Sequence, residues 1–528
     1  EIFADQNDMI AKLSKDQVIR AKLDAETLSI TIYNSTEKSH TNVDGSFMWS
    51  QLYLETLLRM PQRPFAKDEL VQICRQHYHG NESELIKLEN FHQTYTPNDA
   101  VKWYTKDCFI YRSLNKALRV QDIDLLFAFG FMILDIFNQL KLENNRFHYT
   151  TGETIIRCYR GQAIAKEELN QVKSNIGHFI SMNSFLSTTQ DRTVALIFAP
   201  TSNEIYEKVL FEIQVDMNLM QTMPFADVAH LSYFDQEKEI LFMCGAIFQI
   251  KNVINNETEG LWIVQLALCS ETSNELKDLF DYQKQRMADT TDLISIGKLL
   301  REMGKFDKAK RYYQRFLCEL SSNDPNISVC YYGLGVVHDR EDNYDEALHY
   351  FKKALDFQLT VLFLNDSVFI GKIYGSSGIV YYHKHEYDLA LEHFEKSLNI
   401  LLRTIGQDHG DTALIYTNIG RTYQAQKSYD LALENQSKAL AIRLKVLPPD
   451  HPRLARSYLF IGDVYGDKQE FQLSLINYKK ALKIQQKSLP ENYIAIGITF
   501  HRIGRMSTNA REYQSALESY ILNFILSN

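Results

Sequence analysis

Residues 420–432 read GRTYQAQKSYDLA, and this stretch decides the fold of the C-terminal half of the chain. It contains a glycine, an aromatic residue nine positions later and a small residue three positions after that. The pattern occurs six times between Gly297 and Ala516, and successive glycines are 38, 43, 42, 42 and 42 positions apart. A regular period of this length indicates a repeat array whose units stack on their neighbours.

Each unit is predicted to be a pair of helices. Apolar residues in the stretch 344–359 recur at i, i+3, i+4 and i+7, which is the pattern of one helix face. The glycine and the small residue allow the two helices to approach closely, and packing is the expected role of these positions. The glycines, aromatic residues and small residues of the six units are Gly297, Phe306 and Ala309; Gly335, Tyr344 and Ala347; Gly378, Tyr387 and Ala390; Gly420, Tyr429 and Ala432; Gly462, Phe471 and Ser474; and Gly504, Tyr513 and Ala516.

The units resemble tetratricopeptide repeats. The 42-residue spacing, with GQDH at 406–409 and PPDH at 448–451, is similar to the long repeats of kinesin light chains. The resemblance implies an all-α superhelix of about six units over residues 290–528, with a groove that binds a protein or peptide. Asn418 and Arg421 are candidates to line that groove. The last unit, 504–528, is expected to end soon after its second helix begins, as a cap or a truncated unit.

The N-terminal half changes periodicity along its length. Helix-period segments occupy residues 46–140, including 122–140, and short β-rich runs follow. Helices followed by strands favour an α+β domain. We expect an extension at 1–44 (a lid, a strand-bearing segment or the end of a longer chain), a domain at 45–270, a linker helix at 271–289 and the array at 290–528. The β-rich runs are 155–159, 185–187, 208–215, 239–242 and 246–253.

Three polar clusters lie on these runs: YRG at 159–161, STT at 187–189 and EKE at 237–239. An arginine beside a glycine favours a cation that meets a phosphate or carboxylate where the backbone approaches closely. Glu237 and Glu239 alternate with Lys238, so on a strand both carboxylates point to one face. One can stabilise positive charge developing on a sugar while the other orients or deprotonates a nucleophile. In isolation, a solvated strand edge with ordinary salt bridges explains this pair equally well.

In this order the clusters resemble the arginine-serine-glutamate signature of ADP-ribosyltransferases of the clostridial toxin and vertebrate ecto-enzyme type. The match includes FLSTT at 185–189 and EKEIL at 237–241. YRSLNKALR at 111–119 matches the helical Tyr-x3-Asn-x2-Leu-Arg motif of similar toxins. Thr189 is a departure, since serine is commoner there. The resemblance spans about residues 45–270 and implies helices followed by a two-sheet β core.

The resemblance also implies how NAD⁺ would be bound. Arg160 would hold its diphosphate or ribose, and the Gly161 backbone would bond the nicotinamide amide. Phe198, eleven residues after Ser187, has the spacing of the aromatic residue that stacks on nicotinamide, although a phenylalanine at this apolar spacing is also typical of a core. Ser187 would brace the site beneath Glu239. The full set of residues expected at NAD⁺ is Arg160, Gly161, Ser187, Thr188, Phe198, Tyr111, Asn115 and Arg119.

The expected catalytic residues are Arg160, Ser187, Glu237 and Glu239. The resemblance assigns Glu239 to the 2′-hydroxyl of the nicotinamide ribose and to the oxocarbenium-like transition state. Glu237 would orient the incoming guanidinium and accept its proton, because glutamate at that position accompanies arginine transfer in the family. Residues 233–236 would belong to the loop that faces the acceptor, and loop packing is the alternative.

Composition excludes several other classes. A net charge of −9 and a pI near 6.0 argue against a nucleic-acid partner. The seven cysteines include no CxxC pair, so neither a zinc site nor a disulfide framework is expected, and a reducing compartment fits best. The fifteen histidines form no HExxH motif, so no metal is expected. The apolar stretch 125–140 is interrupted by Asp135 and Asn138 and is shorter than the ~20 residues of a membrane span.

We therefore expect a cytoplasmic mono-ADP-ribosyltransferase without a membrane partner, since residues 1–15 also lack the apolar core of a signal peptide. It would transfer ADP-ribose from NAD⁺ to arginine side chains of a protein that the repeat array selects. One alternative is an NAD⁺ glycohydrolase on the same site, where water replaces the acceptor and Glu237 is not required. Another is a catalytically inactive adaptor in which only the repeats act.

Overall fold

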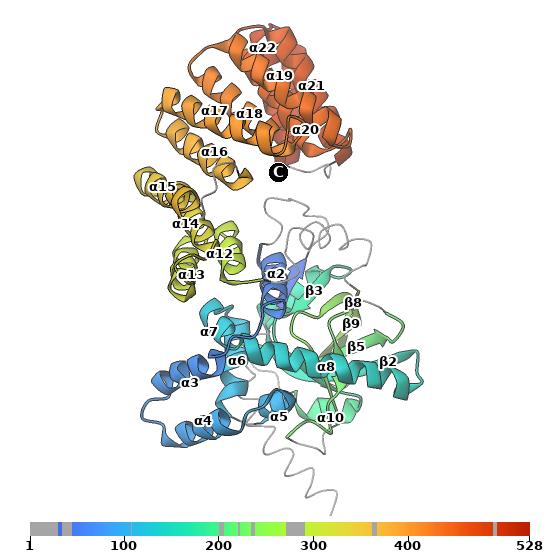
Figure 1. Cartoon of the computed structure of the whole chain (residues 1–528). Coiled ribbons are helices and arrows are strands. Elements are labelled where there is room, and N and C mark those ends of the chain that lie inside the picture. Colours follow the sequence, from blue (N-terminus) through green and yellow to red (C-terminus); the bar gives the residue numbers. More distant parts are fainter. Residues whose placement is uncertain are drawn as a thin grey trace, which may run out of the picture. The chain divides into compact units, whose positions relative to one another are not determined.

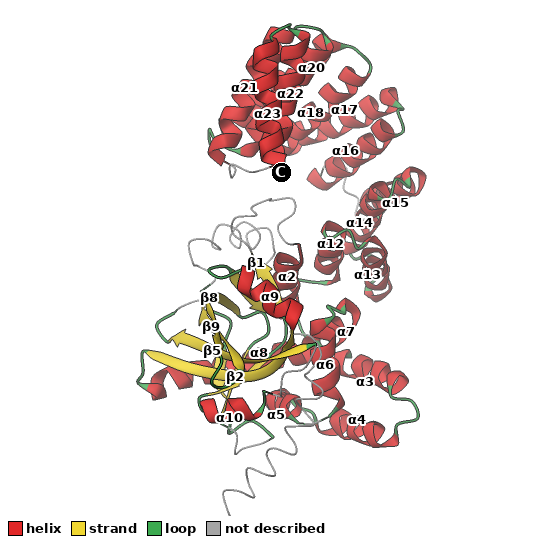
Figure 2. Ribbon diagram, turned by 180° about the vertical axis from the view of Figure 1, so that it is seen from behind, coloured by secondary structure: helices red, strands yellow, loops and turns green. Residues whose placement is uncertain are grey.

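The computed structural model describes residues 30–33, 45–106, 108–199, 205–219, 222–233, 238–270, 291–361, 367–488 and 494–527. The chain divides into two compact units. The first contains residues 1–37 and 42–292, and the second contains residues 38–41 and 293–528. All described strands belong to the first unit, and the described part of the second is helical (Figure 1, Figure 2). The linker helix expected at 271–289 lies outside the described residues.

The helices of the first unit precede most of its strands. Side-chain caps start three of this unit's described helices, since Asn81 accepts a hydrogen bond from the Glu84 amide, Asp122 accepts one from the Leu125 amide and Asp191 accepts one from the Thr193 amide. The described helices are α2 (Gly45–Leu58), α3 (Ala66–His77), α4 (Glu82–Thr94), the short 3₁₀ helix η1 (Pro97–Asp99), α5 (Ala100–Thr105), α6 (Phe109–Arg119), α7 (Ile123–Ala128), α8 (Gly130–Thr151), α9 (Lys166–Ser174) and α10 (Arg192–Ile197).

The apolar stretch 125–140 is divided between α7 and α8, which meet at Phe129. The helix-period segment 122–140 therefore contains two helices, and Phe129 is the C-cap of the first and the N-cap of the second. Met132, Ile133 and Ile136 are fully buried, so α8 packs as a core helix. Within the described part of the chain, the search for a helix long and apolar enough to span a bilayer finds none.

The strands form one mixed sheet. They are β1 (Ile30–Tyr33), β2 (Ile155–Ala165), β3 (Phe179–Met182), β4 (Leu186–Thr189), β5 (Tyr206–Asp216), β6 (Phe225–Asp227), β7 (Glu239–Phe242), β8 (Ile247–Asn256) and β9 (Leu261–Leu268). Their order is β1-β3-β8-β9-β5-β2-β4-β7-β6, and among these described strands only β5 and β9 pair in parallel. β1 brings a piece of the segment 1–44 into the sheet by pairing with β3.

The expectation of a two-sheet core is therefore wrong for the described strands. β2 pairs with β5 along its full eleven residues. On its other side it pairs with β4 through a single register pair, Tyr159 with Thr189. This single pair joins β4, β7 and β6 to the remaining strands, so the described strands form one sheet.

The second unit consists of six helix pairs, which confirms the repeats predicted from the period. The pairs are α12 (Leu293–Glu302) with α13 (Phe306–Glu319), α14 (Asn326–Arg340) with α15 (Tyr344–Thr360), α16 (Val368–His383) with α17 (Tyr387–Thr404), α18 (Gly410–Ala425) with α19 (Tyr429–Val446), α20 (Pro452–Asp467) with α21 (Phe471–Ser488) and α22 (Ile494–Asn509) with α23 (Tyr513–Ser527). The last unit was expected to end soon after its second helix begins. That second helix is α23, which has 15 residues and is of ordinary length.

The repeat glycines are needed where the two helices of a pair touch. A Cβ on Gly335 would lie 2.6 Å from the ring of Phe351, and one on Gly462 would lie 2.5 Å from Tyr478. In each unit the residue that meets the glycine lies sixteen positions later. It is aromatic in every unit except the one at Gly420, where it is Gln436.

The turn between the helices also repeats. The residue seven positions after each glycine has a positive φ, from 58° at Asp342 to 70° at Gly304. A left-handed residue at this point ends the first helix and starts the return, as at many helix C-termini.

Candidate active site

The strands that carry the three predicted motifs are neighbours in the sheet, in the order β2-β4-β7. Tyr159 lies opposite Thr189, and Thr189 lies opposite Glu239. Residues directly opposite one another in an antiparallel pair are close enough for their side chains to interact. The sheet therefore brings Tyr159, Thr189 and Glu239, one residue from each motif, to one row.

Arg160 connects the first motif to the second. Its Nε donates to Gln162 Oε1 at 3.0 Å, and its Nη1 donates to the Ser187 carbonyl oxygen at 3.0 Å. The guanidinium thus lies across β4, and Ser187 contributes its backbone to this contact. Ser187 itself is half-buried on β4.

Gly161 lets helix α10 rest directly on β2. A Cβ at this position would lie 1.9 Å from the Ala195 carbonyl oxygen and 3.0 Å from Ala199 Cβ. No side chain fits there without moving the backbone of α10. Phe198 forms the C-terminal cap of this helix and is partly exposed.

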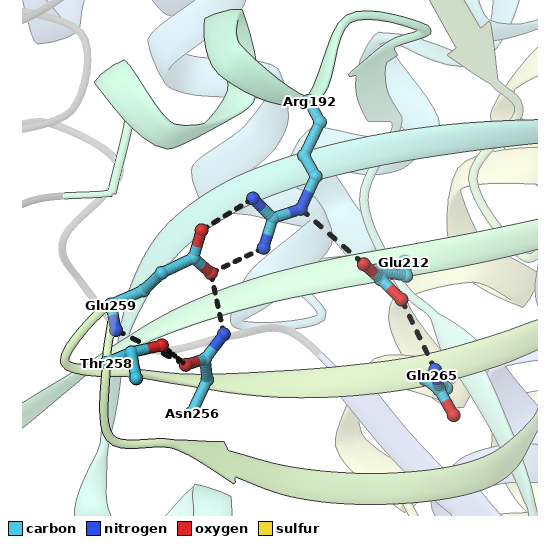
Figure 3. A network of polar contacts seen from close by, with 6 residues as sticks. All are labelled: Arg192, Glu212, Asn256, Thr258, Glu259 and Gln265. Atoms are coloured by element: carbon cyan, nitrogen blue, oxygen red, sulfur yellow. Dashed lines mark hydrogen bonds and ion pairs between the residues drawn. The ribbon is translucent and has the colours of Figure 1, made fainter.

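A polar network holds the first turn of α10 (Figure 3). Arg192 Nη1 and Nη2 donate to the two carboxylate oxygens of Glu259 at 2.8 and 2.5 Å, and its Nε lies 3.7 Å from Glu212 Oε1. Asn256 donates to Glu259 at 2.8 Å, and Gln265 donates to Glu212 at 3.3 Å. The hydrogen bond to Glu259 raises the pKa of Arg192. The network joins α10 to β5, to β9 and to the turn between β8 and β9.

Glu239 begins β7 and is only 8% exposed. Ser232 Oγ donates to its Oε2 at 3.4 Å, and its carbonyl oxygen accepts from the Val228 amide at 2.9 Å. The carboxylate is therefore held between β7 and the segment after β6. Glu237, together with residues 234–236 of the expected acceptor loop, lies outside the described residues.

Thr188 lies on the buried face of β4, between the half-buried Ser187 and Thr189. Its Oγ1 donates to the Ile240 carbonyl oxygen at 2.8 Å. The side chain therefore holds β4 against β7.

The α6 motif contacts the second motif through Tyr104. Tyr104 Oη donates to Asn115 Oδ1 at 3.2 Å, and its ring lies 5.5 Å from that of Tyr111 and 4.7 Å from that of Phe185. Asn115 is buried, while Tyr111 and Arg119 are partly exposed. Sequence reasoning missed Tyr104, because a tyrosine on the short helix α5 carries no motif of its own.

Three cysteines of the first unit are deeply buried. Burial raises the pKa values of Cys74, Cys158 and Cys244 to about 12, so these thiols stay protonated near neutral pH. Among the described residues, no group of three or more His, Cys, Asp or Glu side chains is arranged to hold a metal ion.

Comparison with known proteins bears on the second unit. A family model described as "Tetratricopeptide repeat" matches residues 290–359, 369–445 and 411–487. The C-terminal unit is a tetratricopeptide-repeat array. Arrays of this kind bind proteins or peptides, so the array gives this chain a role in protein interaction. No curated protein matches the chain closely enough to count as a relative.

Solved structures match part of the chain at low identity. BtubC (BKLC) from P. vanneervenii is 17% identical, with a TM-score of 0.37, over 43% of this chain and 90% of its own. A putative kinesin light chain from Podosopora anserina with nearly identical TPR-like repeats is 18% identical, with a TM-score of 0.35, over 39% of this chain and 96% of its own.

Proposed function

We propose that the first unit is an NAD⁺-dependent mono-ADP-ribosyltransferase that modifies arginine side chains, and that the tetratricopeptide array binds the protein that carries them. The row Tyr159, Thr189 and Glu239 is the observation that carries this proposal. Each motif alone has a common structural explanation. Their meeting on three neighbouring strands favours one shared site.

The residues around Arg160 suit a dinucleotide. A guanidinium offers a planar fork of donors that matches a diphosphate. Next to it, the side-chain-free Gly161 leaves the β2 backbone close to α10. The partly exposed ring of Phe198 at the end of α10 is available to stack on a cationic ring.

NAD⁺ supplies the ADP-ribosyl group in this reaction and releases nicotinamide. Glu239 would stabilise the positive charge that develops on the ribose as the bond to nicotinamide breaks. Its burial lowers the local dielectric and strengthens that interaction. Ser232 would fix the carboxylate through the hydrogen bond to Oε2. Glu237 would accept the proton that the arginine nitrogen loses when it bonds to the ribose carbon.

Two alternatives use the same chain differently. In an NAD⁺ glycohydrolase, water takes the place of the arginine, and Glu237 has no acceptor to orient. In an adaptor, the array alone acts and the first unit is a scaffold. The tetratricopeptide array by itself is compatible with either alternative.

The deciding experiment measures nicotinamide release from NAD⁺ with and without agmatine, a soluble arginine mimic. It compares the full chain with Glu237→Gln, Glu239→Gln and, as a matched control on an exposed turn, Glu257→Gln. We expect agmatine to be ADP-ribosylated by the parent chain and by the control. Glu239→Gln should abolish both release and transfer, and Glu237→Gln should lose mainly transfer.

Other outcomes identify the alternatives. Release that is insensitive to agmatine and to Glu237→Gln indicates a glycohydrolase. A chain that never releases nicotinamide is an adaptor. Transfer that survives Glu239→Gln overturns the site proposed here.

A further inference from the structure

Helix α5 (Figure 1) is six residues long, and none of the predicted motifs falls on it. Five of its residues are buried, and Lys102 is exposed. The Val101 amide donates to Gln139 Oε1 on α8 at 2.8 Å, and the ring of Trp103 lies 5.2 Å from that of Phe91 on α4. These contacts fix α5 within the first unit, so the last two residues of the helix are held in place.

Tyr104 contacts the elements on which NAD⁺ binding is expected. Its Oη donates to Asn115 Oδ1 at 3.2 Å, and its ring lies 5.5 Å from that of Tyr111 and 4.7 Å from that of Phe185. Tyr111 and Asn115 are four positions apart on α6, so they lie on one face of that helix. The hydroxyl turns the Asn115 oxygen toward α5, which leaves the amide nitrogen to donate in another direction.

Thr105, the next residue, contacts the segment that holds Glu239. Its Oγ1 accepts from the Tyr233 amide at 2.9 Å and donates to the Val101 carbonyl oxygen at 3.0 Å. Tyr233 directly follows Ser232, whose Oγ donates to Glu239 Oε2 at 3.4 Å. Thr105 therefore anchors the backbone one residue away from the group that contacts the carboxylate.

We propose that α5 is a positioning element of the NAD⁺ site. Tyr104 orients the face of α6 that carries Tyr111 and Asn115, and Thr105 holds Ser232 against Glu239. Each hydroxyl acts through another residue. This inference rests on the proposed function, and it assigns different steps to two adjacent side chains: Tyr104 supports the binding of NAD⁺, and Thr105 supports the cleavage of the bond to nicotinamide.

The test measures nicotinamide release by the full chain as a function of NAD⁺ concentration. Tyr104→Phe keeps the ring and removes the hydroxyl. Loss of one such hydrogen bond should raise KM for NAD⁺ about three- to tenfold, with little change in kcat.

Thr105→Val keeps the shape of the side chain and removes the acceptor of the Tyr233 amide. It should lower kcat about three- to tenfold with little change in KM, because Glu239 acts in the transition state. Thr105→Ser keeps the hydroxyl and should restore most of kcat.

Tyr78→Phe is the matched control. It removes a hydroxyl that lies 2.9 Å from Ser113 Oγ, and Ser113 is also on α6. Both kinetic constants should stay at the values of the parent chain. Urea denaturation of each variant measures stability, and a purely structural role for the two hydroxyls predicts lower stability without opposite effects on KM and kcat.

Hydrogen exchange tests the anchor without the chemistry. The Tyr233 amide should exchange faster in Thr105→Val than in the parent chain, because its acceptor is lost. In Thr105→Ser and Tyr104→Phe the exchange of this amide should match that of the parent chain.

The proposal is overturned if Tyr104→Phe and Thr105→Val change KM and kcat alike, if Thr105→Ser behaves as Thr105→Val does, or if exchange of the Tyr233 amide is the same in all variants. A parent chain that releases no nicotinamide overturns the proposed function. If exchange still responds to Thr105→Val in that chain, α5 holds the segment for a purpose other than NAD⁺ cleavage.

Discussion

Thr189 on β4 lies directly opposite Glu239 on β7, fifty positions further along the chain. On the other side of β4, Tyr159 lies opposite the same threonine. Helix α10 covers the neighbouring Gly161, so the row and the helix are parts of one arrangement. The first two predictions concern what holds that helix in place.

Gly161→Ala is expected to destabilise the first unit and, if that unit cleaves NAD⁺ as proposed, to abolish nicotinamide release. The added Cβ meets the Ala195 carbonyl oxygen, so α10 must move. Overpacking of this kind costs about 1–3 kcal/mol in the free energy of unfolding, and a clash with backbone lies at the upper end. Urea denaturation measures it. Gly130→Ala is the control, because its Cβ meets only Leu57 Cδ2 at 3.5 Å and should cost little.

Arg192 and Glu259 are expected to be coupled in a double-mutant cycle. Their side chains are 32% and 35% exposed, so solvent screens the pair, and we expect a coupling of about 0.5–1 kcal/mol. If the first unit binds NAD⁺, Arg192→Ala should raise KM for NAD⁺ more than it lowers kcat, because α10 carries Phe198. If the changes in the free energy of unfolding of the two single variants add up to that of the double variant, the bidentate pair does not hold the helix.

Two equivalent tyrosines of the array should respond oppositely to the loss of their hydroxyl. Tyr313 Oη is buried without a hydrogen-bond partner, so Tyr313→Phe should be neutral or stabilise the array by about 1 kcal/mol. Tyr478 Oη donates to Asp463 at 2.6 Å, so Tyr478→Phe should destabilise it by about 1 kcal/mol. Thermal unfolding of both variants measures the difference, and a shift of the same sign in both would contradict this account.

The array should lose stability as the pH falls below about 6.5. Burial, and to a lesser degree Lys396, lowers the pKa of His393 below the ordinary histidine value of 6.5. In that window the unfolded chain binds a proton that the folded chain does not, so the free energy of unfolding decreases with falling pH. Urea denaturation at pH 7.5 and 5.5 should show the decrease, and His393→Asn should reduce it. An undiminished decrease in the variant would move its origin to another histidine, such as His451, whose pKa is also lowered.

The period of the array was readable from the sequence because its contacts are local. Gly335 meets Phe351 sixteen positions later, and the same offset recurs in every unit. A packing rule that repeats in the structure also repeats in the sequence. The sequence shows that Gln436 replaces the aromatic residue of the other units. The burial of Arg443 against Ser457 and Thr417 is not visible in the sequence, because it depends on three helices.

The motifs of the first unit were visible as short polar stretches on β-rich runs, and their residue types suggested a shared chemistry. The order of the strands in the sheet was not visible in the sequence, because strand pairing joins distant segments through backbone hydrogen bonds that any residue type can make. Two sheets were expected, but the single backbone pair between Tyr159 and Thr189 joins the described strands into one sheet.

The sequence by itself determined the helix pairs and the candidate residues, because period and spacing are properties of neighbouring positions. Only the tertiary structure decided that β2, β4 and β7 are adjacent, that Arg192 reaches Glu259 and that Tyr104 joins Asn115 to Phe185. These contacts join residues from different elements. Their geometry depends on how the sheet twists and how the helices pack on it, which local patterns do not encode.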